Sequence, residues 1–319
     1  FKILFLHFPK DNTQIEGTAL PKHFSENGHE CFLAFEKKPR TFFCELRNGF
    51  LFDITKDQLL KNNFDLIVGK SDCFQSYDKR YFKNSKSFKV NILTLGLKRN
   101  ILGTDYCFKD DQLIKAPPDD MSAEFHNYKE YSSRQNFIYT PASIGTDKNQ
   151  LEFIDLVEPQ LIDNFTYVFS GPIRSKNYFQ KMVERLDSKN IKWRYLGHLN
   201  KVQVAKVMKS SKILCLTTDP RPAQPYDPSP RVLPESACAG TPFLVNDLVI
   251  FNSFLDKFGA VYKNGNKHSL NNALQNLLFD DLDDLSKKMH LTALEKLNMP
   301  YACQSAYQDI MTRYERGRK

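Results

Sequence analysis

Two carboxylates, Asp227 and Glu235, lie on either side of a helix start in the stretch DPSPRVLPESACAGTPFLVND. The preceding segment DPRPAQPYDPSP holds five prolines, which fix φ and stiffen a long loop. The helix is predicted to begin around Pro230–Arg231, because proline is well tolerated in a first helical turn. The N–H groups of Arg231 and Val232 would favour a phosphate or diphosphate, and the helix dipole adds to that preference. Glu235, one turn further on, can accept hydrogen bonds from the vicinal hydroxyls of a sugar.

A structural interpretation of the same acids stays open. Asp227 is then a solvated carboxylate, and Glu235 is an acid near a helix start that favours the dipole. The surrounding pattern favours the binding site instead, since a short helix of small residues ends at Gly240 and an apolar strand follows it.

Strands that alternate with helices must position these residues. In the first part of the chain, strands are predicted at 2–8, 31–35, 64–69 and 90–96, with a helix that begins at 18 and ends at Gly28. In the second part, strands are predicted at 136–143, 165–171, 191–197, 212–218, 241–247 and 259–263, with intervening helices at 149–162, 177–190 and 200–211. This alternation is typical of parallel sheets covered on both faces, in the α/β class.

The chain is expected to form two domains. A polar segment at 109–135 with no apolar period separates the two series, so the expected domains are 1–130 and 131–300, and the last residues are helical. Ligands of open α/β sheets bind outside the carboxyl ends of the strands, so two facing domains would create one central cleft.

The composition narrows the class of protein. The formal net charge of +8 is spread along all 319 residues, which favours an anionic small substrate or peripheral contact with a membrane surface over nucleic acid. Seven scattered cysteines without a CxxC pair are typical of reduced thiols, and the start FKILFLHFPK reads as a core strand rather than a signal peptide. A cytoplasmic protein is therefore expected.

Other site motifs are missing from the sequence. No GxGxxG follows the first strand, and no GxxxxGK[ST], HExxH or paired-cysteine pattern occurs. The acidic run DDLDD suggests a metal only weakly, because it lies in a helical charge run. We expect neither a metal nor a cofactor.

The stretch from Asp227 to Val245 resembles the donor-sugar site of retaining GT-B glycosyltransferases (glycosyl transferases group 1, family 4-like), in which two acids seven residues apart are followed by small residues, Gly and Pro. The segments KILFLHF and EGTALPKHFSENGHECFLAF resemble the first strand, glycine loop and following turn of that family. The resemblance implies two Rossmann-like domains that face a central cleft, an acceptor-side domain and a donor domain, with residues 301–319 as a helix that returns to the first domain.

The resemblance also implies roles for the acids and cations. Glu235 would bind the nucleotide ribose, and Asp227 would face the donor sugar ring. Lys148 would neutralise the donor diphosphate. The family keeps an arginine five residues before that lysine, but this sequence has Ser143 there. Either Arg231 or Arg174 supplies that charge, or the diphosphate is held differently.

Further donor-binding positions follow from the same resemblance. Gly197 matches the turn whose backbone receives the nucleobase, with His198 and Leu199 beside it, and Gly17 matches the N-terminal glycine loop. Ser229 and Val232 complete the implied donor-binding set.

Two residues of the first domain are candidates for the acceptor side. His7 follows the first strand and would reach the cleft, although a structural histidine fits equally well. Lys70, in GKSD, would contact the acceptor, and a capped helix start is its structural alternative.

These expectations define an enzyme that moves a sugar from a nucleotide-sugar donor to a glycan, lipid-linked or protein acceptor with retention of configuration and without a metal. Two alternatives remain: a GT-B-fold sugar-nucleotide epimerase or phosphorylase, and a two-domain non-enzymatic protein that binds a sugar or anion. The residues name neither the base, the sugar nor the acceptor.

Overall fold

A computed structural model describes residues 1–6, 19–37, 40–48, 50–70, 87–92, 106–108, 123–219, 227–228, 230–250, 253–279 and 282–317. The chain divides into two compact units. Unit 1 comprises Phe1–Ala116 together with Asn298–Lys319, and unit 2 comprises Pro117–Leu297. The divisions therefore lie at 116/117 and 297/298, where the sequence suggested 130/131 and 300/301.

Unit 1 is built on a seven-stranded mixed sheet with the order β4-β3-β2-β1-β5-β6-β7. Its strands are β1 (Lys2–Leu6), β2 (Glu30–Lys37), β3 (Arg40–Arg47), β4 (Phe50–Asp53), β5 (Leu66–Lys70), β6 (Phe88–Ile92) and β7 (Tyr106–Phe108). β1 pairs in parallel with both β2 and β5, as expected for a β-α-β start. The antiparallel strands β3 and β4 were not expected. The sequence does carry a signal for their hairpin, the Asn-Gly pair that begins at Asn48, and in the structure Asn48 has the positive φ of 49° that such a turn requires.

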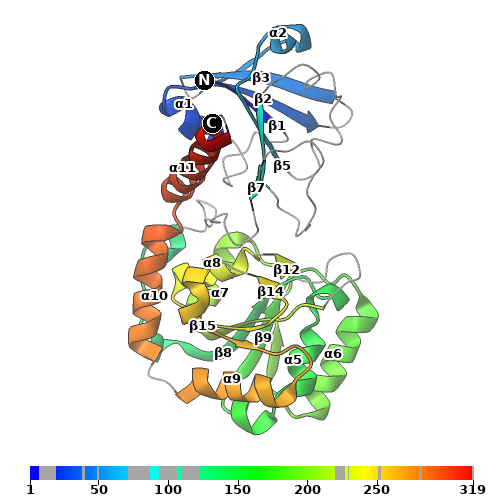
Figure 1. Ribbon diagram of the computed structural model, residues 1–319. Coiled ribbons are helices and arrows are strands. Elements are labelled where there is room, and N and C mark those ends of the chain that lie inside the picture. Colours follow the sequence, from blue (N-terminus) through cyan, green and yellow to red (C-terminus); the bar gives the residue numbers. More distant parts are fainter. Residues whose placement is uncertain are drawn as a thin grey trace. The chain divides into compact units, whose positions relative to one another are not determined.

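The C-terminal helix completes the core of unit 1. α11 (Met299–Gly317) packs beside α1 (Leu20–Glu26), as Figure 1 shows. Ala306, Ile310 and Tyr314 of α11 are buried in one cluster with Phe5 and Phe24. The end of the chain therefore covers the same face of the sheet as its first helix.

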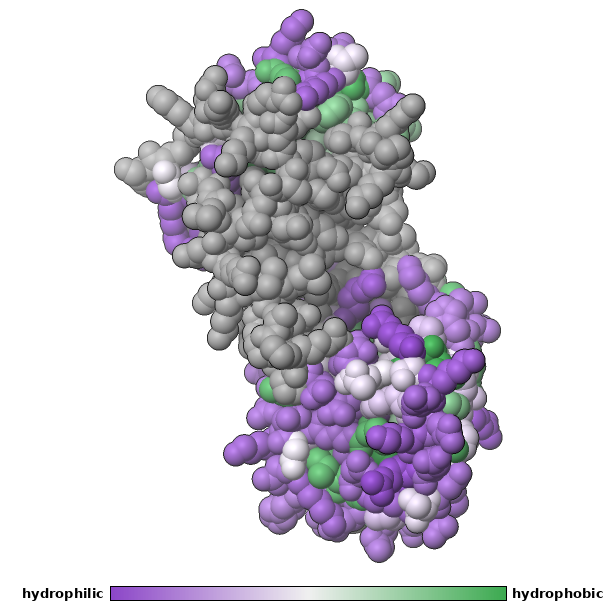
Figure 2. Space-filling model, turned by 90° about the vertical axis from the view of Figure 1, so that its right-hand side faces the viewer, coloured by the Kyte–Doolittle hydropathy of each residue, from purple (hydrophilic) through white to green (hydrophobic). Residues whose placement is uncertain are grey.

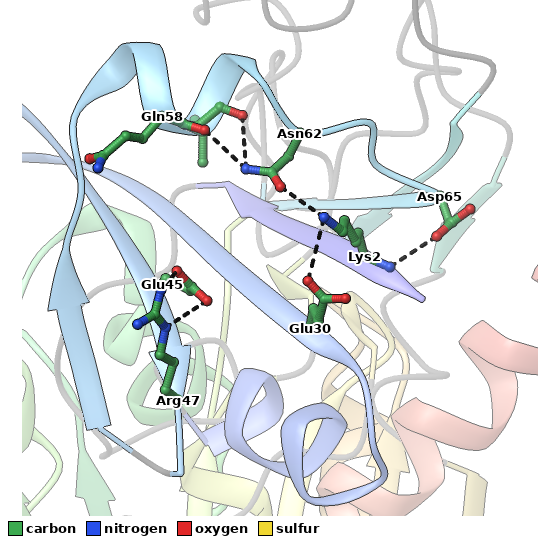
Figure 3. Close-up of polar contacts among 8 residues, drawn as sticks. Lys2, Glu30, Glu45, Arg47, Gln58, Asn62 and Asp65 are labelled. Atoms are coloured by element: carbon green, nitrogen blue, oxygen red, sulfur yellow. Dashed lines mark hydrogen bonds and ion pairs between the residues drawn. The ribbon is translucent and has the colours of Figure 1, made fainter.

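Polar contacts join the first residues of unit 1 to neighbouring strands (Figure 3). The backbone N–H of Lys2 donates to Asp65 Oδ2 at 2.9 Å, and its Nζ donates to Asn62 Oδ1 at 3.1 Å. The same ammonium lies 3.5 Å from Glu30 Oε2, at the start of β2. These groups are partly exposed, so each pair contributes little to stability and chiefly fixes where the strands begin.

Unit 2 has a six-stranded, fully parallel sheet with the order β10-β9-β8-β11-β13-β15. Its strands are β8 (Gln135–Pro141), β9 (Thr166–Ser170), β10 (Trp193–Tyr195), β11 (Ser211–Leu216), β13 (Phe243–Asn246) and β15 (Gly259–Tyr262). Its helices are α5 (Gln150–Leu156), α6 (Lys176–Ser188), α7 (Lys201–Ser210), α8 (Val232–Ala239), α9 (Lys267–Phe279) and α10 (Leu282–Lys296). The strand order reverses between β8 and β11, which makes this point the topological switch of the sheet.

The helix predicted over 149–162 is wrong in its second half. α5 ends at Leu156, and a separate 3-10 turn, η5, spans Pro159–Ile162. Val157 and Glu158 are extended, and for Glu158 the reason is Pro159, because a proline disfavours the helical conformation of the residue before it. Lys189 Nζ satisfies the end of α5 by donating to the carbonyls of Ile154, Asp155 and Val157.

A buried arginine anchors the carboxyl end of α8. Arg134 donates to the carbonyl oxygens of Ala239 at 3.0 Å and Gly240 at 2.9 Å, and to Thr241 Oγ1 at 2.9 Å. Its other donors reach the carbonyl of Lys129 at 2.9 and 3.1 Å. Burial lowers the pKa of Arg134, yet carbonyls at a helix C-terminus suit a cation through the dipole.

The face of unit 2 that Figure 2 shows is mainly polar. Figure 2 shows hydrophilic residues predominating on this face of the unit, with apolar residues singly or in small groups. Within the described part of the chain, no helix combines the length and apolar character that crossing a membrane requires.

We expect Arg134→Met to destabilise unit 2 by at least about 3 kcal/mol, because several hydrogen bonds to buried carbonyl oxygens are lost at once. Trp193 is the chain's only tryptophan and lies in β10, so urea unfolding followed by its fluorescence reports on unit 2. Arg185→Met is the control, since Arg185 forms an exposed ion pair with Asp155 worth about 0–1 kcal/mol. Equal stabilities of the two variants would contradict the anchoring role.

Candidate functional site

Two adjoining cavities lie where β8, β9 and β11 end. The larger has a volume of about 320 Å³, and its described lining comprises Pro141, Ala142, Lys148, Lys201, Leu216, Pro230, Arg231, Val232 and Glu235. The smaller has a volume of about 230 Å³, and its described lining comprises Pro141, Ala142, Ser143, Ser170, Gly171, Pro172, His198, Leu199, Lys201, Val204, Val232 and Glu235. Both cavities lie at the topological switch point, where parallel α/β sheets bind ligands.

Backbone hydrogen bonds join the loops that form the smaller cavity. The N–H of Ala142 donates to Ser170 O at 3.0 Å, and the N–H of Gly171 donates to Gly197 O at 2.8 Å. Gly171 has a φ of 138°, and a Cβ there would lie 2.2 Å from the carbonyl oxygen of Ala142. Only glycine therefore lets these two strand ends approach so closely.

Lys148 is held by a short turn that is tied to the end of β11. The 3-10 turn η4 (Thr146–Lys148) begins with a hydrogen bond from Lys148 N to Gly145 O at 3.1 Å. Thr217 Oγ1, just beyond β11, donates to Lys148 O at 2.7 Å. Asn149 follows in the left-handed conformation, which asparagine tolerates better than most residues. The lysine that the sequence singled out thus lines the larger cavity from a fixed backbone.

The short helix α8 brings Arg231, Val232 and Glu235 to the cavities. Arg231 is its N-cap residue, and Arg231 O accepts a hydrogen bond from Glu235 N at 3.2 Å. At the other end, Gly240 is left-handed with a φ of 66°, and its carbonyl accepts from Ser286 Oγ of α10 at 2.6 Å. The helix begins close to the predicted position and ends at the predicted glycine.

Glu235 is the only carboxylate in the described lining of the two cavities. The residue is only 9% exposed, and burial raises the pKa of its carboxyl group to about 7. Arg231 and then Lys201 oppose that rise, because nearby cations favour the charged form. A ligand that donates hydrogen bonds to Glu235 would stabilise the carboxylate in the same way.

The structure brings together several residues that the sequence predicted. Lys148, Arg231, Val232 and Glu235 line the larger cavity, while His198 and Leu199 line the smaller. Gly197 lies next to them in the left-handed conformation, with a φ of 73°.

Other predicted residues are not placed at these cavities. Arg174 is exposed, pairs with Asp147 at 3.1 Å, and does not belong to the described lining of either cavity. The backbone of Asp227 pairs with Val249 in a two-stranded ladder of β12 (Asp227–Pro228) and β14 (Val249–Ile250), but its side chain lies outside the description. Lys70 ends β5, and its side chain also lies outside the description. The predicted residues that lie outside the described ranges altogether are His7, Gly17 and Ser229.

Sequence reasoning missed Lys201, which lines both cavities. Its signal is positional, because Lys201 is the first residue of α7 and closely follows the end of β10. It also missed the wall formed by Ser170 and Gly171, which the glycine at the end of the predicted strand 165–171 could have indicated.

The glycosyl transferases group 1 family model matches residues 122–294, which is more than half of the chain. The chain therefore belongs to this glycosyltransferase family. The match falls within unit 2, which carries both cavities.

Solved structures with the same fold agree with this assignment. AviGT4, a glycosyltransferase involved in avilamycin A biosynthesis, is 15% identical, with a TM-score of 0.60 over 99% of this chain and 97% of its own. HepE from Anabaena, in complex with UDP, is 12% identical, with a TM-score of 0.60 over 98% of this chain and all of its own. The catalytic domain of starch synthase IV from Arabidopsis thaliana, bound to ADP and acarbose, is 8% identical, with a TM-score of 0.59 over 99% of each chain. The expected α/β fold of GT-B type is confirmed.

The chain has no significant match among curated proteins.

The raised pKa of Glu235 predicts a pH-dependent stability of unit 2. A carboxyl group whose folded pKa of about 7 exceeds its usual 4.5 favours folding while protonated, and this advantage is lost as pH rises from about 4.5 through 7. The parent should therefore lose about 3 kcal/mol relative to Glu235→Gln between pH 4.5 and 8, measured by urea unfolding with Trp193 fluorescence.

The charged groups near Glu235 do not obscure that comparison. Arg231, Lys201 and Lys148 are present in both proteins, so they are common to the two pH profiles. Tyr139 and Cys238 lie near the carboxylate, and burial raises the pKa of each well above the range tested. His198 of the smaller cavity is likewise present in both proteins, so it does not distinguish their profiles. Parallel pH profiles would show that Glu235 ionises normally.

Proposed function

We propose that the protein transfers a sugar from a nucleotide-sugar donor to a glycan, lipid-linked or protein acceptor, with retention of anomeric configuration. No cofactor and no essential metal ion takes part. The observation that carries this proposal is the charge distribution of the larger cavity, in which Lys148, Lys201 and Arg231 surround a space that also contacts the nearly buried Glu235.

These groups suit a nucleotide sugar better than a simple anion. The cations can bind the diphosphate, while Glu235 can accept hydrogen bonds from the ribose hydroxyls. The structure of HepE holds UDP and that of starch synthase IV holds ADP, which supports a nucleotide-sugar donor and leaves the base open.

The chemistry is an exchange of one C–O bond for another at the anomeric carbon. The bond from that carbon to the diphosphate oxygen breaks, and the acceptor hydroxyl attacks from the same face. Its proton passes to the departing phosphate oxygen, so no protein nucleophile is needed. Lys148 and Arg231 stabilise the negative charge that develops on the leaving diphosphate, which is the usual work of a metal ion.

A panel of UDP-, GDP-, ADP- and CMP-sugars tests the function, first with EDTA and then with a divalent cation added in excess of it. We expect one donor to be hydrolysed slowly, or transferred when an acceptor is supplied, with the anomeric configuration retained in the product by NMR. Inversion would overturn the retaining mechanism, and activity that a divalent cation alone restores would overturn the metal-independent one. Interconversion of donors would indicate an epimerase, phosphorolysis of a glycan a phosphorylase, and tight binding without turnover a binding protein.

Glu235→Gln should lower the affinity for the preferred nucleoside diphosphate at least tenfold above pH 7.5, because the ribose loses a charged acceptor. Asp227→Asn should reduce turnover more than nucleotide binding, since Asp227 is proposed to face the sugar. Calorimetry with the nucleoside diphosphate measures the first effect, and donor turnover the second.

The matched control for both variants is Glu184→Gln. Glu184 is an exposed carboxylate of α6 that contacts Gln180, and it does not belong to the described lining of either cavity. Circular dichroism checks that each variant is folded. Undiminished affinity of Glu235→Gln would remove the ribose role and leave α8 as a structural helix.

A further inference from the structure

The start of α7 is capped by the two residues Asn200 and Gln203, which flank Lys201 in the first turn. Asn200 is the N-cap of α7, and its Oδ1 accepts from Gln203 N at 2.9 Å. Gln203 Oε1 accepts in return from Asn200 N at 3.0 Å, which completes a capping box. The start of α7 is thus fixed by its neighbours, and the Lys201 side chain is directed to the cavities.

Lys201 lies at the junction of the two cavities. Of the described lining residues, Lys148 and Arg231 contact only the larger cavity, whereas Lys201 and Glu235 contact both. Lys201 is also close enough to Glu235 to lower the pKa of its carboxyl group. The ammonium group of Lys201 therefore lies where a ligand that spans both cavities would cross from one to the other.

The order of groups in a nucleotide sugar matches this arrangement. If Glu235 holds the ribose at the junction, the base lies in the smaller cavity and the diphosphate enters the larger one. The phosphate attached to the ribose is then the group nearest the junction. Among the described lining residues, three cations and one carboxylate give the larger cavity a formal charge of +2, which balances the charge of about −2 on a diphosphate diester.

We propose that Lys201 binds the donor phosphate attached to the nucleoside, while Lys148 and Arg231 bind the outer phosphate that carries the sugar. This assignment rests on the proposed function. A lysine suits the inner position, because its flexible stem presents three N–H donors to a tetrahedral anion. The inner phosphate keeps its charge throughout the reaction, so Lys201 serves binding more than the departure of the leaving group.

Affinities for a nucleoside, its monophosphate and its diphosphate separate the two phosphate positions. The base is the one whose diphosphate the parent protein binds most tightly by calorimetry among UDP, GDP, ADP and CDP. Lys201→Gln should weaken the monophosphate and the diphosphate by the same factor, roughly tenfold, and leave the nucleoside unchanged. Lys148→Gln should weaken the diphosphate alone.

Lys206→Gln is the matched control, because Lys206 lies on the same helix, is exposed and pairs weakly with Glu124 at 3.8 Å. It should bind all three ligands like the parent. If Lys201→Gln binds the monophosphate as tightly as this control, or loses nucleoside affinity equally, the assignment is overturned. If the parent binds none of the diphosphates, the proposed function falls as well.

A double variant distinguishes a direct contact from an effect through Glu235. Lys201→Gln should still weaken the diphosphate roughly tenfold in a Glu235→Gln background if Lys201 touches phosphate. The effect should vanish there if Lys201 merely keeps Glu235 ionised, and that result would also overturn the proposal.

Discussion

The site of unit 2 depends on the contact between Arg134 and the carboxyl end of α8. That helix is short, and most of its residues are buried, so its direction is set by what holds its ends. The guanidinium donates hydrogen bonds to the carbonyl oxygens of Ala239 and Gly240. It also lies 5.6 Å from the ring centres of Tyr128 and Tyr131. Because the far end is fixed, the first turn of α8 faces the cavities with Arg231 and Glu235 in place.

A nearly buried carboxylate beside the cavities destabilises the folded state. Desolvation makes the charge of Glu235 unfavourable, and Arg231 and Lys201 offset only part of that cost. Polar groups arranged in this way favour a ligand that donates hydrogen bonds to the carboxylate and brings negative charge to the cations. Under the proposed function, stability is given up at this position for donor binding, a trade-off that is common at functional sites.

The sequence predicted unit 2 well because a parallel sheet buried on both faces leaves an apolar run for each strand, and prolines and glycines mark the ends. Glu235 was singled out by the helix start before it, whereas Lys148 was singled out only by the resemblance to the glycosyltransferase family, and both line the larger cavity. Lys201 was missed, because an exposed lysine at a helix start is common and only the strand order shows what it faces. The antiparallel hairpin of unit 1 was missed because a β-α-β start was assumed to continue.

Backbone geometry and charge constrain this site to different degrees. The contacts of Gly171 with Ala142 and Gly197 require particular backbone positions, and a side chain at Gly171 would collide with main-chain atoms. The position of a positive charge is less constrained than that of the backbone. Coulomb attraction to the proposed phosphate depends on distance, so the charge can come from any residue that lies close enough. Ser143 therefore need not leave the cavity short of a cation when α7 and α8 each present one at their first turn. The fold can persist at low sequence identity because the contacts between strand ends are made by main-chain atoms, while the charges can be supplied from several elements.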